Sequence, residues 1–268
     1  MQRPAGRFTA AHRGGAGEPL LCLHGFMDTW RTWELVLPRL ERRHDVLAPT
    51  LPGHAGGSPL PPDVDDDAIV DMLERTLDEA GWATAHIAGN SLGGYLALRL
   101  AARGRARSVV AFAPAGGWAV GDPAFAAVLR MQADLHTQTR AAAAQAVLSA
   151  GTPTGRRAAT RLLTVRYEHL PEDLVAHLTL GVAACDALPL IEAALRTGYS
   201  LDAAAVACPV RVVWGTDDVL LPWPSTAVRF REDWLPHADW VELDGVGHAP
   251  QLDVPLEAAE LILGLTAA

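Results

Sequence analysis

Lysine is absent from this chain of 268 residues: all 22 basic residues are arginine, and asparagine occurs once, as Asn90. The absence of lysine excludes the phosphate-binding loop that ends in Gly-Lys, Schiff-base catalysis and the usual attachment of pyridoxal phosphate. Any chemistry must therefore be carried by other nucleophiles and bases.

Cysteine is scarce, with three isolated residues, Cys22, Cys185 and Cys208, in no paired spacing. This number and spacing favour neither a zinc site nor a disulfide framework. The ten histidines are scattered without ligand spacing, so we expect no metal.

Long apolar runs are also missing. The N-terminal MQRPAGRFTAAHRGG lacks the apolar stretch of a signal peptide, and no later window resembles an uninterrupted membrane span. The formal net charge of −9 opposes binding to nucleic acid and to anionic membrane surfaces. We expect a cytoplasmic protein that acts on a small molecule without a nucleic-acid or membrane partner; a homo-oligomer stays open.

Short apolar runs that end in turn residues alternate with longer segments of helical periodicity. We expect strands at 19–23, 45–48, 85–88, 108–113, 209–214 and 238–243, and helices at 30–40, 64–81, 92–102 and 254–265. This alternation predicts an α/β fold with a mostly parallel central sheet flanked by helices.

Between Gly116 and about Ser200 the alternation stops, and Ala- and Leu-rich segments broken by glycine and proline take its place. The position of this stretch between two core strands predicts a helical cap over one end of the sheet. We therefore divide the chain into a core, 1–116 and 201–268, and a cap, 117–200.

The sequence HIAGNSLGG places Gly89 and Gly93 two positions on either side of Ser91, between an expected strand and an expected helix. A sharp turn at this junction lifts its central side chain above the end of the sheet, and bulky neighbours would collide there. Ser91 is thus a candidate nucleophile. The following Leu92 N–H, at the start of a helix, is a candidate oxyanion donor.

A serine hydroxyl needs a base that is itself oriented by a carboxylate. His248 lies in DGVGHAP, directly after the last expected strand, and Asp217 and Asp218 lie in WGTDDVLLP, after the strand before it. Because parallel strands end at one edge of a sheet, these side chains are expected beside Ser91. At this point either carboxylate could serve as the acid.

Four separated motifs resemble those of the α/β-hydrolase family, and the likeness covers nearly the whole chain except the cap: His24-Gly25, Gly89 to Gly93, Gly215 to Asp218, and Gly245 to His248. The order Ser91, Asp218, His248 is also that of this fold. The resemblance selects Asp218 over Asp217 as the acid and implies the Phe26 N–H as a second oxyanion donor. It makes His24 and His54 structural residues.

The implied reaction is hydrolysis of a carboxylic ester, lactone or thioester through an acyl-enzyme, with no cofactor. We call the sharp turn from Gly89 to Gly93 the elbow. A serine at the elbow disfavours the alkyl-enzyme chemistry of epoxide hydrolases and haloalkane dehalogenases, which use aspartate there. Two alternatives stay open. The Gly-Asn-Ser-Leu-Gly elbow resembles that of hydrolases that cleave carbon–carbon bonds in vinylogous diketones, although Asn90 could instead pack its amide into the turn. The chain could also be a small-molecule binding protein.

The substrate pocket is expected to be mainly apolar and to lie beneath the cap. Candidate lining residues are the large side chains of the cap helices: Trp118, Phe125, Met131, Leu135 and Tyr167. Such side chains on helices also serve as ordinary packing residues.

Overall fold

The computed structural model describes residues 8–61 and 63–267. The first seven residues, on which part of the expected cytoplasmic location depends, lie outside this range, as does Pro62 in the loop after the second expected strand. None of the described helices is long and apolar enough to cross a bilayer alone; two consecutive helices, 172–183 and 188–197, pass that test only jointly and are bent by 63°.

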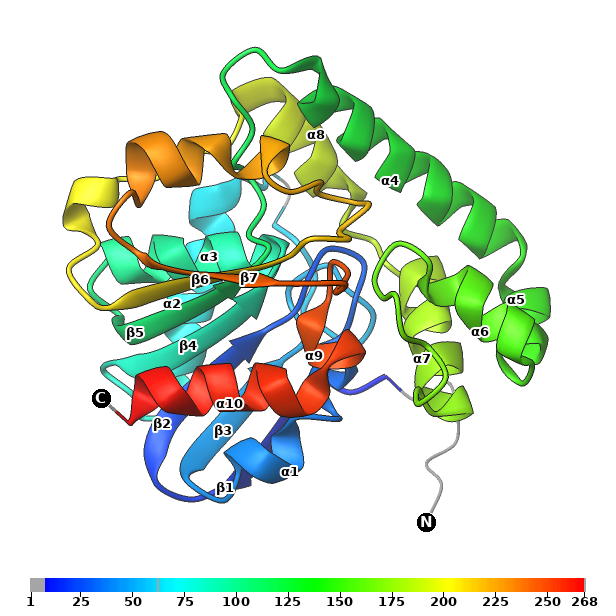
Figure 1. The fold of residues 1–268 in the computed structure, drawn as a ribbon, viewed down its shortest axis with the longest axis horizontal. Coiled ribbons are helices and arrows are strands. Elements are labelled where there is room, and N and C mark those ends of the chain that lie inside the picture. Colours follow the sequence, from blue (N-terminus) through cyan, green and yellow to red (C-terminus); the bar gives the residue numbers. More distant parts are fainter. Residues whose placement is uncertain (1–7, 62, 268) are drawn as a thin grey trace.

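A seven-stranded sheet with the order β1-β3-β2-β4-β5-β6-β7 forms the centre of the molecule (Figure 1). Six strands are parallel, and β1 at the edge pairs antiparallel with β3. The strands are Ala11–Gly15 (β1), Glu18–Leu23 (β2), His44–Pro49 (β3), Ala85–Asn90 (β4), Ala106–Phe112 (β5), Val210–Gly215 (β6) and Asp239–Leu243 (β7). This confirms the expected α/β class with a mostly parallel sheet.

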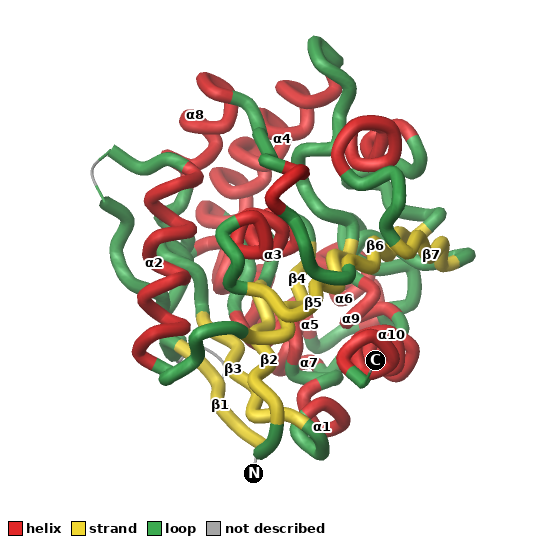
Figure 2. The backbone as a smooth tube through the Cα atoms, turned by 90° about the vertical axis from the view of Figure 1, so that its left-hand side faces the viewer, coloured by secondary structure: helices red, strands yellow, loops and turns green. Residues whose placement is uncertain are grey.

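Helices cover both faces of the sheet (Figure 2). On one side lie α2 and α3, and on the other lie α1 and α10. The helices are Leu37–Leu40 (α1), Asp66–Glu79 (α2), Leu92–Ala102 (α3), Pro123–Ala141 (α4), Ala143–Ala150 (α5), Pro153–Thr160 (α6), Glu172–Ala183 (α7), Leu188–Thr197 (α8), Pro250–Asp253 (α9) and Pro255–Thr266 (α10).

The central strands are apolar on both faces because both faces are covered. In β2, Leu21 and Leu23 join the core beneath α2 and α3, whereas Leu20 and Cys22 join the core beneath α1 and α10. Continuous apolar runs in the sequence therefore mark these strands better than strict alternation does.

Five helices, α4 to α8, lie between β5 and β6 in the chain, and we call them the inserted helices. Figure 1 shows α4 to α7 in green beside one end of the sheet. Over residues 117–200, all of which are described, the chain forms helices and loops and no strand. The assignment of this stretch as a separate cap domain stays a prediction.

Two local expectations were wrong or incomplete. The strand β1 was not predicted, because it is an edge strand without a fully buried residue and carries no apolar signal. The helix expected at 30–40 is divided into a 3₁₀ turn, Trp30–Trp33, and the short α1. Pro38 cannot donate a backbone hydrogen bond, so a continuous helix is unfavourable there.

Candidate active site

Ser91 occupies a strained turn between β4 and α3. Its φ of +54° lies in a region that residues other than glycine rarely adopt. The turn is held by three backbone hydrogen bonds: the Ser91 N–H donates to Phe112 O at 2.9 Å, and Ser91 O accepts the N–H groups of Tyr95 and Ala115, both at 3.0 Å. Backbone groups of β5, of α3 and of the segment after β5 therefore hold the strained turn in place.

The two glycines of the elbow are required for space. A Cβ atom on Gly89 would lie 2.2 Å from the carbonyl oxygen of Gly93, and one on Gly93 would lie 2.2 Å from that of Leu23. Neither glycine has a positive φ, so conformational freedom is not the reason. The steric explanation of the Gly-x-Ser-x-Gly spacing is confirmed.

The loop after β2 packs directly against the elbow. A Cβ atom on Gly25 would lie 3.3 Å from Ser91 Cβ, and the Asp28 N–H donates to Gly25 O at 3.3 Å across a tight turn. The turn places Phe26 beside Ser91 in both of the cavities described below. On the other side of Ser91, the Leu92 N–H is the first of α3 and has no carbonyl partner within the helix.

His24 and His54 lie behind this loop and not in the cavities. The Leu51 N–H donates to His24 Nε2 at 2.8 Å, so Nδ1 carries the proton and donates to Gly25 O at 2.8 Å. Burial lowers the pKa of His24 well below its usual value and that of His54 to about 4. Both rings are therefore neutral at pH 7, as a structural role requires.

His248 and Asp218 form a buried pair on the loops after β7 and β6. Their exposed fractions are 2% and 3%, and His248 Nδ1 donates to Asp218 Oδ2 at 2.7 Å. Asp218 Oδ1 accepts the N–H groups of Leu220 and Leu221 at 2.9 and 2.7 Å. Asp217, by contrast, is exposed. The geometry thus pairs His248 with the carboxylate that the family resemblance selected.

The second ring nitrogen of His248, Nε2, is not engaged by Asp218. Because Nδ1 carries the proton, Nε2 is an acceptor; it is buried and has no hydrogen-bond partner among the described residues. Ser91 lines the same cavity as His248, but no hydrogen bond joins Ser91 Oγ to Nε2 in the described part of the chain. Such bonds are often long without substrate and shorten in the reactive complex.

A pair of buried amides holds the His248 loop against the elbow. Asn90 Nδ2 donates to His248 O at 2.9 Å and to Phe112 O at 3.2 Å. Gln251 Nε2 donates to Asn90 Oδ1 at 3.1 Å and to Thr32 Oγ1 at 3.2 Å. The Asn90 amide therefore packs into the turn, one of the two interpretations left open by the sequence. Gln251 was missed, and its position three residues after His248 was the only available signal.

Asp253 is a second residue that sequence reasoning missed. This buried carboxylate accepts the N–H groups of Gly247 at 2.7 Å, of Val165 at 3.0 Å and of Arg166 at 2.7 Å. It thereby joins the His248 loop to the segment between α6 and α7. No pattern in the sequence indicates this contact, because Val165 and Arg166 are 88 and 87 residues away in the chain and take part through backbone groups.

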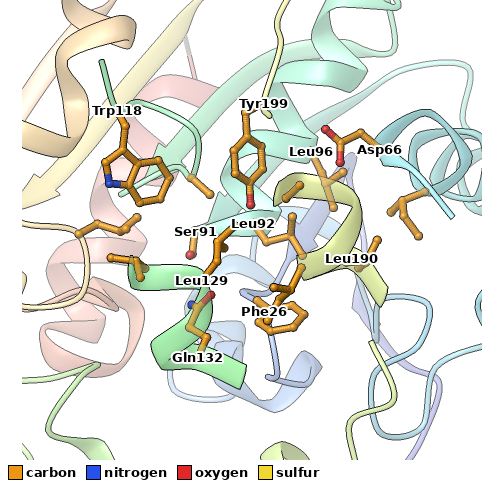
Figure 3. Close-up of a pocket in the computed structure, with 16 residues that line it drawn as sticks. Phe26, Asp66, Ser91, Leu92, Leu96, Trp118, Leu129, Gln132, Leu190 and Tyr199 are labelled. Atoms are coloured by element: carbon orange, nitrogen blue, oxygen red, sulfur yellow. The ribbon is translucent and has the colours of Figure 1, made fainter. Parts of the chain in front are cut away.

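Ser91 lies between two cavities that also share Phe26 and Gln132. The smaller has a volume of about 30 Å³ and is mostly apolar, and Figure 3 shows side chains of this cavity around Ser91: Leu92, Leu96, Trp118, Leu129, Leu190 and Tyr199. The larger, of about 320 Å³, extends along the inserted helices α4 to α7.

Of the five lining residues expected from the inserted segment, Trp118 lines the smaller cavity and Leu135 the larger. Phe125, Met131 and Tyr167 line neither of the two. Phe125 packs its ring against Trp118, with ring centroids 5.4 Å apart, which is the ordinary packing role. Within the described residues, no group of three or more side chains is arranged to hold a metal ion.

A sequence model of the Alpha/beta hydrolase family matches residues 20–261, so the chain belongs to that family. It is 36% identical over 206 residues to "Epoxide hydrolase EphH" of Mycobacterium tuberculosis, covering 72% of this chain and 91% of the relative. It is also 39% identical over 119 residues to "2-hydroxymuconate semialdehyde hydrolase" of Pseudomonas sp. strain CF600, covering 42% of each chain.

The fold is shared with solved structures of low sequence identity. A thermophilic esterase from Thermogutta terrifontis aligns with a TM-score of 0.72 over 96% of this chain and 92% of that chain, at 20% identity. This likeness concerns the fold alone. The expected family and fold are therefore confirmed, while the particular reaction is a matter for proposal.

Proposed function

We propose that this protein is a serine hydrolase that cleaves a carboxylic ester, lactone or thioester of a small, largely apolar substrate through an acyl-enzyme. The observation that carries this proposal is the buried, unpartnered Nε2 of His248 in the cavity that Ser91 also lines. Its other nitrogen is fixed by Asp218, which makes Nε2 the natural acceptor for the Ser91 proton.

In the proposed reaction, Ser91 Oγ attacks the carbonyl carbon while its proton passes to His248 Nε2. Asp218 stabilises the resulting imidazolium. The Phe26 and Leu92 N–H groups bind the oxyanion, and each such donor commonly contributes about 3 kcal/mol to transition-state stabilisation. His248 returns the proton to the leaving alcohol or thiol, and water then attacks the acyl-enzyme with His248 as the base. The acid is released and Ser91 regains its proton.

The name of the mycobacterial relative raises epoxide hydrolysis as a competing function. Attack by Ser91 on an epoxide carbon would form an ether, which offers no carbonyl to water. A carboxylate nucleophile instead forms an ester that water can hydrolyse. With serine at the elbow, we therefore favour acyl transfer.

Carbon–carbon bond hydrolysis of a vinylogous diketone is the second candidate. It is favoured by the Gly-Asn-Ser-Leu-Gly elbow and by the relative named 2-hydroxymuconate semialdehyde hydrolase. Against it, both polar atoms of the Asn90 amide are already bonded to protein groups. A binding protein without turnover is the third candidate.

The test is turnover of 4-nitrophenyl acetate by the wild-type protein, by Ser91→Ala and by Ser225→Ala, which removes an exposed serine as a control. We expect Ser91→Ala alone to abolish turnover. Full turnover in Ser91→Ala would refute the nucleophile assignment. A panel of esters, thioesters, lactones, a vinylogous diketone and an epoxide then identifies the bond that is cleaved.

A further inference from the structure

Asp28 lines the larger cavity together with Ser91 and His248, yet the proposed reaction does not use it. It lies two positions after Phe26, at the end of the tight turn. Among the described residues that line this cavity, it is the only one with a carboxyl group. As a residue, Asp28 is half-buried.

The carboxyl group of Asp28 is held in place from behind. Oδ1 accepts the Thr29 N–H at 2.7 Å, and the Thr32 hydroxyl also donates to the carboxyl group. Thr32 Oγ1 in turn accepts from Gln251 Nε2, so the amide pair at the elbow supports this arrangement. An ionised carboxylate offers about four acceptor positions. The described residues supply two donors, so acceptor positions remain for a group that enters the cavity.

The other charged or titratable groups among the described lining residues are Arg161 and His248. Arg161 is exposed and its Nη1 donates to Ala158 O, and His248 is paired with Asp218. Most of the remaining lining side chains are apolar or uncharged, such as Leu135, Thr179 and Val182. A polar group in the wall of such a cavity determines how a ligand is oriented.

Asp28 also lowers the stability of the folded protein at neutral pH. Burial raises the pKa of its carboxyl group from 3.8 to about 7, although the hydrogen bonds of Thr29 and Thr32 oppose the shift. A carboxyl group with a raised folded-state pKa stabilises the fold below its unfolded pKa, and this contribution is lost as pH rises through 7. A carboxyl group kept at such a position is a candidate functional residue.

We propose that Asp28 is a specificity-determining residue, which binds a hydrogen-bond donor, a hydroxyl or an ammonium group, on the substrate arm that occupies the larger cavity. This inference rests on the proposed function, because it names the substrate class of the same site. The apolar walls hold the carbon chain of that arm, and the carboxylate binds its polar end. Ser91 then attacks the carbonyl group between this arm and the rest of the substrate.

The variant Asp28→Asn reverses the polarity at this point. The amide oxygen stays with the Thr29 N–H, so the amide NH₂ group takes the place of the second carboxylate oxygen. The cavity then presents a donor where it had presented an acceptor. Asp134→Asn, which removes an exposed carboxylate on α4, is the matched control with the same change in net charge.

The substrates are 4-nitrophenyl esters with acyl chains of about six to ten carbons that end in methyl, hydroxyl or ammonium, and acetates of alcohols with the same three ends. A hydrogen bond to a charged group commonly raises binding affinity by roughly tenfold or more. At pH 8 we therefore expect kcat/KM to be about tenfold higher for the substrate that ends in hydroxyl or in ammonium than for the one that ends in methyl. Asp28→Asn should abolish this preference and Asp134→Asn should keep it. The proposal would be overturned if Asp28→Asn kept the preference of the wild-type protein. It would also be overturned if the wild-type protein showed no preference for a donor, whether the donor is on the acyl chain or on the alcohol.

A binding measurement keeps this test separate from the proposed function. Calorimetric titration of Ser91→Ala with hexan-1-ol, hexylammonium and 1-methoxypentane needs no turnover; the ether is a donor-free isomer of the alcohol. We expect at least one donor to bind about tenfold more tightly than the ether, and to lose this advantage when Asp28→Asn is added. Equal affinities for all three would contradict the role of Asp28 even if Ser91 proves to be the nucleophile.

Discussion

The edge of the sheet that carries Ser91, Asp218 and His248 differs from the inserted helices in how its parts are fixed. At the edge, buried side chains hold one another and the backbone through hydrogen bonds: His248 donates to Asp218, and Asn90 donates to the backbone of the His248 loop. The inserted helices α5 and α6 are largely exposed and contribute mainly walls of the larger cavity. From this difference we expect substitutions at the edge to change mainly the rate of turnover, and substitutions in the inserted helices to change mainly the choice of substrate.

The largest expected effect comes from substitutions of the two residues that would activate Ser91. His248→Ala and Asp218→Asn should each lower kcat for 4-nitrophenyl acetate by about 10³- to 10⁴-fold, because the proton of Ser91 loses its acceptor or the imidazole loses its tautomer. Asp217→Asn changes an exposed carboxylate one position away and should alter kcat by less than about twofold. Equal losses in Asp217→Asn and Asp218→Asn would mean that the carboxylate was assigned incorrectly.

The second effect concerns the space beneath the elbow. In Gly93→Ala the new Cβ must displace the carbonyl oxygen of Leu23, which shifts the elbow and β2 apart. We expect at least about a hundred-fold loss of kcat/KM together with a lower unfolding temperature. Gly264→Ala in α10 meets only ordinary contacts and should keep activity and raise stability by about 0.5–1 kcal/mol. Full activity in Gly93→Ala would refute the steric account.

The pH dependence of stability tests whether the two regions unfold together. Burial lowers the pKa of His54, in the core, and of His177, in α7, to about 4. Unfolded histidine has a pKa of about 6.5, so the unfolded chain binds protons that the folded protein does not. The contribution of these neutral rings is complete above pH 6.5 and is lost as pH falls towards 4, by about 1.4 kcal/mol per pH unit for each histidine.

Denaturant unfolding at pH 7, 6 and 5 measures this slope. The slope gives the number of protons that the chain takes up on unfolding. His54→Gln and His177→Gln should each lower this number by about one, and both should act on the same unfolding transition. A separate transition that responds only to His177→Gln would show that the inserted helices unfold independently of the sheet.

The smallest effect is a change of selectivity in the inserted helices. Leu135→Trp enlarges a side chain that lines the larger cavity, and should lower kcat/KM for esters with long acyl chains several-fold, up to about tenfold, relative to acetate. Leu195→Trp, on the exposed face of α8, is the control and should leave the ratio unchanged. The ratio of kcat/KM for 4-nitrophenyl octanoate and acetate is the measurement. An unchanged ratio in Leu135→Trp would remove this cavity from the substrate path.

The same division explains what could be predicted from the sequence. The edge was predictable because parallel strands end together, and because the spacing of Gly89, Ser91 and Gly93 has a steric cause. Ser91 and His248 line one cavity, and Asp218 is hydrogen-bonded to His248 behind it. Their catalytic roles stay predictions.

What the sequence could not show depends on contacts between distant segments. The bond from Gln251 to Thr32 spans 219 positions in the chain, and the bonds of Asp253 reach the inserted segment. Buried amides and carboxylates of this kind have no periodic pattern. Other wall residues were missed for the same reason: Leu129, Gln132 and Tyr199 line the smaller cavity because of how α4 and the segment after α8 pack near Ser91.

The central claim is that Ser91 is a nucleophile activated by His248, and covalent labelling with a fluorophosphonate tests it most directly. The reagent bonds to an activated serine with loss of fluoride, and peptide mass spectrometry locates the adduct. The account predicts one adduct on Ser91, formed about a thousand-fold more slowly in His248→Ala. An adduct on another residue, no adduct in the wild-type protein, or an unchanged rate in His248→Ala would contradict it.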